Sequence, residues 1–227
     1  MPHTGPQYCE TPLTGVYSFP VEFINTISNF PTMFLGLLAL YIVWRTSPRA
    51  WELWILSFLL LATGIGSTLW HGLRSGWALS FDVFPGVLFL LFLVFCWGAL
   101  VSGRLIGFLA PLILLGIQAF AFSSLSFTGT VSPFVVLYGS ILFFSILLLW
   151  GTLRKYGKRA AVIGLCAVTL ALFAAAMRTI DFLVCQYVPF GTHLLWHITL
   201  GASAFTAIML IVHIKRFQNN EKIPEGA

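Results

Sequence analysis

The chain has 227 residues, of which 59% are hydrophobic and only 8% are charged. A soluble domain carries about 25% charged residues, so this composition excludes a soluble protein and places most of the surface against lipid. The net charge of +5 does not indicate nucleic-acid binding, because the basic residues lie at the ends of apolar segments, where membrane orientation explains them.

Seven apolar segments follow one another along the chain. A membrane helix needs about 20 apolar residues, so seven helices would use about 140 residues and leave only short loops and tails. Pro111 falls inside the fourth segment and Pro85 near the start of the third, and membrane helices tolerate such prolines. The sequence therefore predicts an all-α, polytopic membrane protein with seven transmembrane helices, at 22–44, 53–72, 81–101, 105–123, 133–151, 160–178 and 193–214.

The basic residues predict the orientation of these helices. Ten of the twelve lysines and arginines follow odd-numbered spans, and only Arg74 and Arg178 lie on the other side. Since basic loops stay in the cytoplasm, the N-terminus is predicted outside and the C-terminus inside. The predicted domains are an extracytoplasmic tail (1–21), a seven-helix transmembrane domain (22–214) and a basic cytoplasmic tail (215–227). Nothing resembles a cleavable signal, so the first helix is expected to be an uncleaved anchor.

Ionisable and polar residues gather at the predicted outer ends of several helices. Because the spans alternate in direction, these residues share one membrane face. Ionisable residues at membrane depth are costly, usually face the bundle interior and indicate function. The set comprises Glu22, Ser67, His71, Asp82, Asp181, His193 and His197.

The spacing of the histidines indicates a metal site. His193 and His197 are four residues apart, so on a helix they share a face with Cβ atoms roughly 6 Å apart. His71 can supply a third nitrogen, and three protein ligands plus a water is the usual layout of catalytic zinc. Imidazole also suits copper, iron and nickel. Ser67 lies one turn before His71, and Asp82 is a carboxylate suited to accept a proton from the metal's water.

Each of these residues alone has a simpler interpretation. A lone histidine at a helix end is commonly interfacial, Asp82 and Glu22 suit helix starts, and Ser67 can bond its own helix backbone. These interpretations do not explain why the residues share one face. The alternatives for the whole chain are a receptor or scaffold with a structural metal, or a metal transporter or haem electron carrier. Structural zinc normally has four protein ligands, which favours the catalytic interpretation.

Two cysteines, Cys9 and Cys185, lie on the predicted outer side of the membrane. An oxidising compartment there would permit a disulfide between them. Such a bond would hold the N-terminal tail over the candidate site.

Taken in order, these motifs resemble the alkaline ceramidase family, seven-helix membrane hydrolases related to the adiponectin-receptor-like proteins. The resemblance runs through nearly the whole chain and is carried by Glu22 to Asn29, Gly66 to His71, Asp82 with Pro85, Asp181 with Cys185, and His193-Leu-Leu-Trp196-His197. The family also pairs a cysteine of the N-terminal tail with one before the seventh span, which matches Cys9 and Cys185.

The resemblance implies a zinc ion held by His71, His193 and His197. Asp82 would then orient and deprotonate the water on the zinc, while Ser67 would support the site and polarise the substrate. The implied reaction is hydrolysis of ceramide to a fatty acid and a sphingoid base, with another lipid amide or ester as the alternative. The implied location is the inner membrane if the protein is bacterial, and the endoplasmic reticulum or Golgi if it is eukaryotic.

The chain departs from this family at its N-terminal motif. Alkaline ceramidases have Asp-Trp-x-Glu-x-Asn there, which binds calcium together with the glutamate of the first span. Here the run is Gln7-Tyr-Cys-Glu-Thr-Pro12, which leaves only Glu10 and Glu22 as carboxylates. Because calcium favours six to eight oxygens, we predict weak or absent calcium binding.

Overall fold

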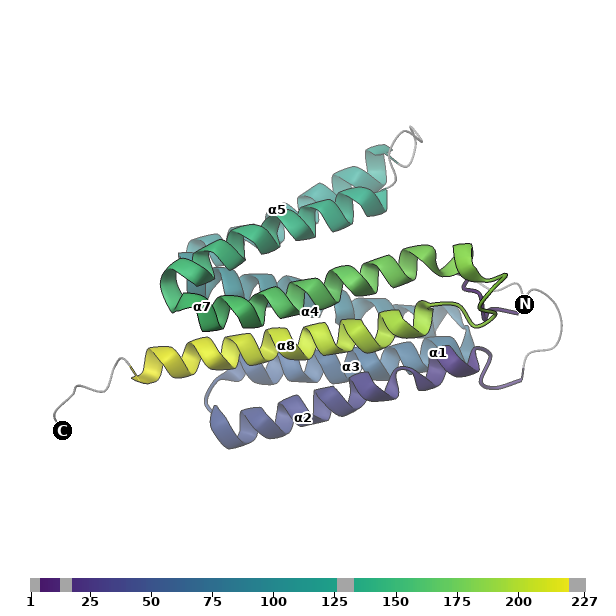
Figure 1. Cartoon of the computed structure of the whole chain (residues 1–227), viewed down its shortest axis with the longest axis horizontal. Coiled ribbons are helices and arrows are strands. Elements are labelled where there is room, and N and C mark those ends of the chain that lie inside the picture. Colours follow the sequence, from purple (N-terminus) through teal and green to yellow (C-terminus); the bar gives the residue numbers. More distant parts are fainter. Residues whose placement is uncertain (1–4, 13–17, 126–132, 221–227) are drawn as a thin grey trace.

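The computed structural model describes residues 5–12, 18–125 and 133–220, and every element assigned within them is helical (Figure 1). This confirms the all-α class. A short helix, α1, opens the bundle, and a π-helical turn, η1, follows α5. The elements are α1 (Phe23–Ile27), α2 (Phe30–Thr46), α3 (Trp51–Leu73), α4 (Gly76–Ser102), α5 (Arg104–Phe120), η1 (Ala121–Leu125), α7 (Pro133–Val184) and α8 (His193–Asn220).

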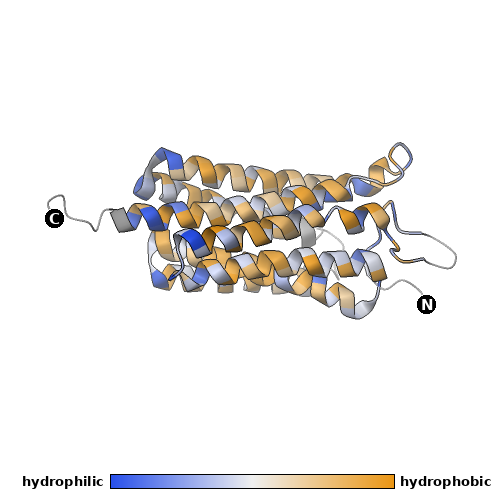
Figure 2. Ribbon diagram, turned by 90° about the horizontal axis from the view of Figure 1, so that it is seen from below, coloured by the Kyte–Doolittle hydropathy of each residue, from blue (hydrophilic) through white to orange (hydrophobic). Residues whose placement is uncertain are grey.

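Within the described residues, six helical stretches are long and apolar enough to cross a membrane. Many large apolar side chains on them point away from the protein, among them Phe34, Phe58, Phe84, Leu105 and Trp150. In Figure 2 the middle of the bundle is largely hydrophobic, and the most hydrophilic residues gather towards its ends. A surface of this kind is stable against lipid, as the composition predicts.

Helix α7 is interrupted at Gly157, which has φ +79° and ψ −178°. A straight helix of its 52 residues would be about 78 Å long, against about 30 Å of hydrocarbon in a bilayer. Figure 1 shows the chain reversing here, so that both arms of α7 extend from the bend towards the same end of the bundle. The reversal supports two crossings by α7, and hence seven in all, which stays a prediction together with the orientation of the termini.

Several helices extend beyond their predicted ends. Helix α4 begins at Gly76, so Asp82 lies in its second turn and does not open it. Helix α7 continues to Val184, so Asp181 lies within a helix and not after one. The basic stretch around Gly157, predicted as a loop, is helical on both sides of the bend.

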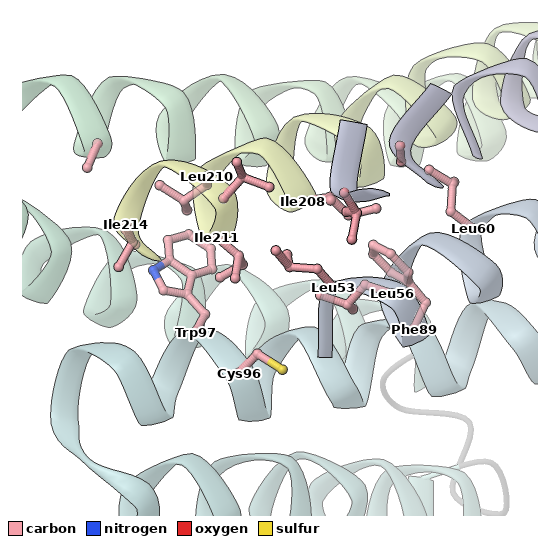
Figure 3. Close-up of a cluster of buried hydrophobic side chains, with 14 of the residues drawn as sticks. Leu53, Leu56, Leu60, Phe89, Cys96, Trp97, Ile208, Leu210, Ile211 and Ile214 are labelled. Atoms are coloured by element: carbon pink, nitrogen blue, oxygen red, sulfur yellow. The ribbon is translucent and has the colours of Figure 1, made fainter. Parts of the chain in front are cut away.

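Among the described residues, the larger of the two hydrophobic core clusters is formed by α2, α3, α4, α7 and α8, and Figure 3 shows the part of it between α3, α4 and α8. Leu53, Leu56 and Leu60 of α3 occupy one side of it, against Ile208 and Ile211 of α8. From this core α3 continues towards its C-terminal end, while α8 continues back towards its N-terminal end. The two helices therefore bring His71 and His193 to the same end of the bundle.

Candidate metal site

Three histidines meet at the end of the bundle where α3 ends and α8 begins. His71, His193 and His197 each offer a ring nitrogen, and these atoms lie within 4.8 Å of one another. The three side chains are almost fully buried, with exposed fractions of 0%, 1% and 5% respectively. Buried imidazoles at this separation have the chemistry and the spacing of a metal site.

Two of the histidines have a defined tautomer. The Nδ1 atom of His71 is hydrogen bonded to the Glu22 carboxylate, which only accepts, so Nδ1 carries the proton. The Ser28 hydroxyl donates to the carbonyl of Asn25 at 2.9 Å. Its oxygen, 2.7 Å from Nδ1 of His197, therefore accepts the Nδ1 proton; the Asn29 amide nitrogen, which could only donate to Nδ1, is 3.4 Å away and too distant to compete. Both histidines consequently keep an unprotonated Nε2, the form in which imidazole binds a metal.

The third histidine is held through its backbone and by stacking. The backbone N–H of His193 donates to Oδ1 of Asp181 at 2.9 Å. Its ring stacks on Tyr8, with centroids 3.8 Å apart and planes inclined by 21°.

Two buried nitrogens of the cluster, Nε2 of His71 and Nδ1 of His193, have no hydrogen-bond partner. Buried polar atoms without partners are uncommon in folded proteins and call for an explanation. A metal ion among the three rings would give these nitrogens a partner. The donor set is neutral imidazole throughout, so the residues present fit a zinc ion.

Asp82 reaches the site through a close contact between α3 and α4. A Cβ atom at Gly66 would collide with the carbonyl oxygen of Phe81, so only glycine allows the two backbones to approach this closely. The next residue, Ser67, is a hydrogen-bond partner of the half-buried Asp82 carboxyl group. Ser67 also lies one helical turn before His71, so Asp82 is placed beside the histidine-bearing face of α3.

The N-terminal tail covers the histidines. Cys9 and Cys185 are joined by a disulfide, and the backbone N–H of Cys9 donates to Oδ2 of Asp181 at 3.0 Å. Gly191 has φ +68° and lies against Cys9 and Asp181, where a Cβ atom would have no room. Asp181, predicted only as one member of the outer set, therefore links the tail, α7 and the start of α8.

Three residues of the site were not singled out from the sequence: Tyr8, Arg74 and Arg178. The guanidinium of Arg178 donates to the Tyr8 hydroxyl at 3.2 Å and lies over the ring of Trp196. Burial raises the pKa of Tyr8 above its usual value, so the hydroxyl stays protonated at neutral pH. The distribution of basic residues between the two predicted faces could have identified the two arginines, because Arg74 and Arg178 are the two basic residues predicted on the outer side.

A family model described as Ceramidase matches residues 5–225, nearly the whole chain. The chain belongs to the ceramidase family. A search of curated proteins finds no match. Membership of the ceramidase family, together with the membrane-length helices, implies an integral membrane hydrolase that acts on the amide bond of ceramide.

Proposed function

We propose that the chain is a zinc-dependent ceramidase, with the metal held by His71, His193 and His197 at one end of the bundle. The observation that supports it best is the buried cluster of three imidazoles with two unpartnered ring nitrogens. When bound there, zinc would supply Lewis-acid chemistry, which polarises the amide carbonyl and lowers the pKa of water to about 7.

Asp82 is the proposed general base and acid. Its carboxylate accepts a proton from the attacking water while the new carbon–oxygen bond forms at the amide carbon. When the carbon–nitrogen bond breaks, Asp82 returns this proton to the departing nitrogen. Ser67, its hydrogen-bond partner on α3, keeps the carboxyl group turned towards the histidine-bearing face. The products are a fatty acid and a sphingoid base.

The surroundings of Asp82 suit a substrate that arrives from the bilayer. Its neighbours on α4, Phe81, Val83 and Phe84, are each more than half exposed on the surface of the bundle. In a membrane these side chains would contact lipid tails. The acyl chain of a lipid substrate could therefore pack beside α4, and the amide of the same lipid could approach Asp82 directly from the bilayer.

The test is fatty-acid release from a panel of ceramides by purified protein in detergent, together with zinc content, for wild type and His197→Ala. The proposal expects release by wild type with about one zinc per chain. Both should be lost in His197→Ala, because its imidazole is one of three ligands.

The other outcomes separate the alternatives. Zinc without release from any lipid amide or ester would support a structural metal in a receptor or scaffold. Release from another lipid amide but not from ceramide would keep the site and change the substrate. Absence of zinc from active wild type would overturn the metal assignment.

A further inference from the structure

Arg74 is buried at the end of α3, three residues after His71. The whole residue is only 5% exposed, and its backbone has φ 51°, a left-handed conformation that residues other than glycine uncommonly adopt. The guanidinium donates to the carbonyl of Pro6 at 2.6 Å and lies 4.1 Å from the centroid of the Trp70 ring. Arg74 therefore turns back over the site and holds the N-terminal tail.

The charge of Arg74 lies against Glu22. Nε of Arg74 is 3.4 Å from Oε1 of Glu22, and the two side chains are 1% and 0% exposed. Burying either charge alone is strongly unfavourable, and removing one partner of a buried pair leaves the other uncompensated. The two residues therefore depend on each other for stability.

Glu22 connects this pair to the candidate metal site. Besides Arg74, its carboxylate accepts hydrogen bonds from Nδ1 of His71 and from the Thr11 hydroxyl. The backbone reinforces the contact, because the N–H of Glu22 donates to the carbonyl of His71 at 3.1 Å. A carboxylate that orients a metal-binding histidine usually sets both the tautomer and the metal affinity. A displacement of Glu22 would thus be transmitted to His71.

The same residues do not fit calcium, which the alkaline ceramidases are expected to bind near this glutamate. The Glu10 carboxylate accepts the backbone N–H groups of Ile24 and Asn25, at 2.6 and 2.8 Å. Glu22 is held by the contacts described above. Among the buried side-chain atoms that the structure describes around Glu10 and Glu22, Oδ1 of Asn25 is the oxygen without a hydrogen-bond partner. Calcium needs six to eight oxygens, and the Arg74 guanidinium would repel a second cation.

We propose that Arg74 is the built-in cation of this site and takes the place of calcium. Its guanidinium balances Glu22, holds the tail over the histidines and, through Glu22, positions His71. Arg74 is a positioning residue, not a catalytic one. The link to metal affinity rests on the proposed zinc site, whereas the coupling between Arg74 and Glu22 does not.

The coupling is tested by a double-mutant cycle on the metal-stripped full chain in detergent, with Arg74→Gln, Glu22→Gln and the double variant. Each single variant should melt below wild type, because it leaves a buried charge unpaired. The melting temperature of the double variant should fall by less than the sum of the decreases in the two single variants. Arg104→Gln, an exposed arginine at the start of α5, is the control and should melt like wild type. Additive losses, or no loss in Arg74→Gln, would overturn the proposal.

The replacement of calcium is tested in the same assay by adding excess calcium or a calcium chelator. Wild type should melt at the same temperature in both. A rise in the wild-type melting temperature with calcium would show that the site still takes the ion and would overturn this part of the proposal.

The positioning role is tested by zinc affinity, measured by competition with a chromogenic chelator and so without turnover. Arg74→Gln should bind zinc about 10–100-fold more weakly, the usual effect of losing support for a ligating histidine. Arg74→Lys keeps the charge and should recover part of the affinity. Equal zinc affinity in wild type and Arg74→Gln would overturn the positioning role. A wild type that binds no zinc would overturn both the metal assignment and the positioning role. The coupling between Arg74 and Glu22 would then still be decided by the double-mutant cycle.

Discussion

The two arginines that lie away from the basic ends of the helices both contact Tyr8. The guanidinium groups of Arg74 and Arg178 lie 5.6 and 5.5 Å from the centroid of its ring. Tyr8 in turn stacks on His193. Membrane orientation does not explain a basic residue on the predicted outer side, so another interaction must account for it. Here that interaction is with the acidic and aromatic groups around the histidines.

The role of Asp82 can be separated from metal binding by the change Asp82→Asn. The amide keeps the shape of the side chain and can still bond Ser67, but it accepts no proton from water. We expect zinc content to stay at the wild-type level and kcat for ceramide hydrolysis to fall about 10²–10⁴-fold, the usual contribution of a general base. Elemental analysis and fatty-acid release measured on the same preparation check both parts. Near-normal kcat in Asp82→Asn would rule out Asp82 as the base.

The sequence predicted which histidines share a face but not what holds them. The spacing of His193 and His197 follows directly from helix periodicity, which is local. The hydrogen bond from His197 to Ser28 joins residues 169 positions apart, and the Arg74–Glu22 pair depends on a left-handed residue at a helix end. Neither has a local pattern, because both depend on how α1, α3 and α8 pack.

Three residues near the C-terminal end of α3 contribute to the site. Gly66 allows close packing against α4, Ser67 is a hydrogen-bond partner of Asp82, and His71 supplies an imidazole. This arrangement needs α4 to lie against Gly66, where a Cβ atom would meet the Phe81 carbonyl. The packing of the two helices therefore sets the distance between Asp82 and the histidines.

Substitution of Gly66 by alanine should separate α3 from α4. Overpacking of a close contact typically costs about 1–3 kcal/mol, so we expect a lower melting temperature in detergent. The rate of ceramide hydrolysis should fall even at temperatures where the variant is still folded, because Asp82 moves away from the face that carries His71. Gly116→Ala in α5 is the matched control, since its Cβ would meet nothing within 4 Å. If the two variants melt and hydrolyse ceramide alike, the contact does not position Asp82.

Element positions were predicted better than element ends. Apolar length alone identified the helices around 53–72 and 193–214, which the structure extends to Trp51–Leu73 and His193–Asn220. Hydropathy placed the start of α4 five residues too late, because residues 76–80 include the weakly apolar Gly76 and Ser80 and show no apolar periodicity. It also missed the helical residues next to Gly157, between the predicted spans 133–151 and 160–178, where lysines and arginines continue the helix beyond the predicted hydrocarbon region.

The disulfide ties the tail to the far end of the chain, across 176 residues. A bond that closes so long a loop stabilises the folded state by about 2–5 kcal/mol. Cys9→Ser or Cys185→Ser should therefore lower the melting temperature in detergent, and a reductant should lower that of wild type to the same value. Cys166→Ser removes an exposed free cysteine and serves as the control. Peptide maps that are identical with and without reductant would show that the bond does not form.

The reversal at Gly157 determines the topology of the whole molecule. If both arms of α7 cross the bilayer, the chain crosses seven times, and residues 49, 158 and 216 share the cytoplasmic side. If α7 counts as one crossing, Arg216 moves to the outside and the segment before α8 moves to the cytoplasm. Tyr187, which is 77% exposed between α7 and α8, is therefore the informative position.

Single cysteines at these positions, in a chain that lacks Cys166, can be labelled in sealed membranes by a reagent that does not cross the bilayer. Arg49→Cys, Lys158→Cys and Arg216→Cys should react only after the cytoplasmic side is opened to the reagent. Tyr187→Cys should react from outside. The reverse result for Tyr187→Cys and Arg216→Cys would place the end of α7 and the start of α8 in the cytoplasm. His193 lies six residues after Tyr187, whereas His71 lies at the opposite end of α3 from Arg49. The same result would therefore put His71 and His193 on opposite faces of the membrane, which contradicts the histidine cluster, and would put Cys185 in the cytoplasm, away from the oxidising environment that its bond with Cys9 requires.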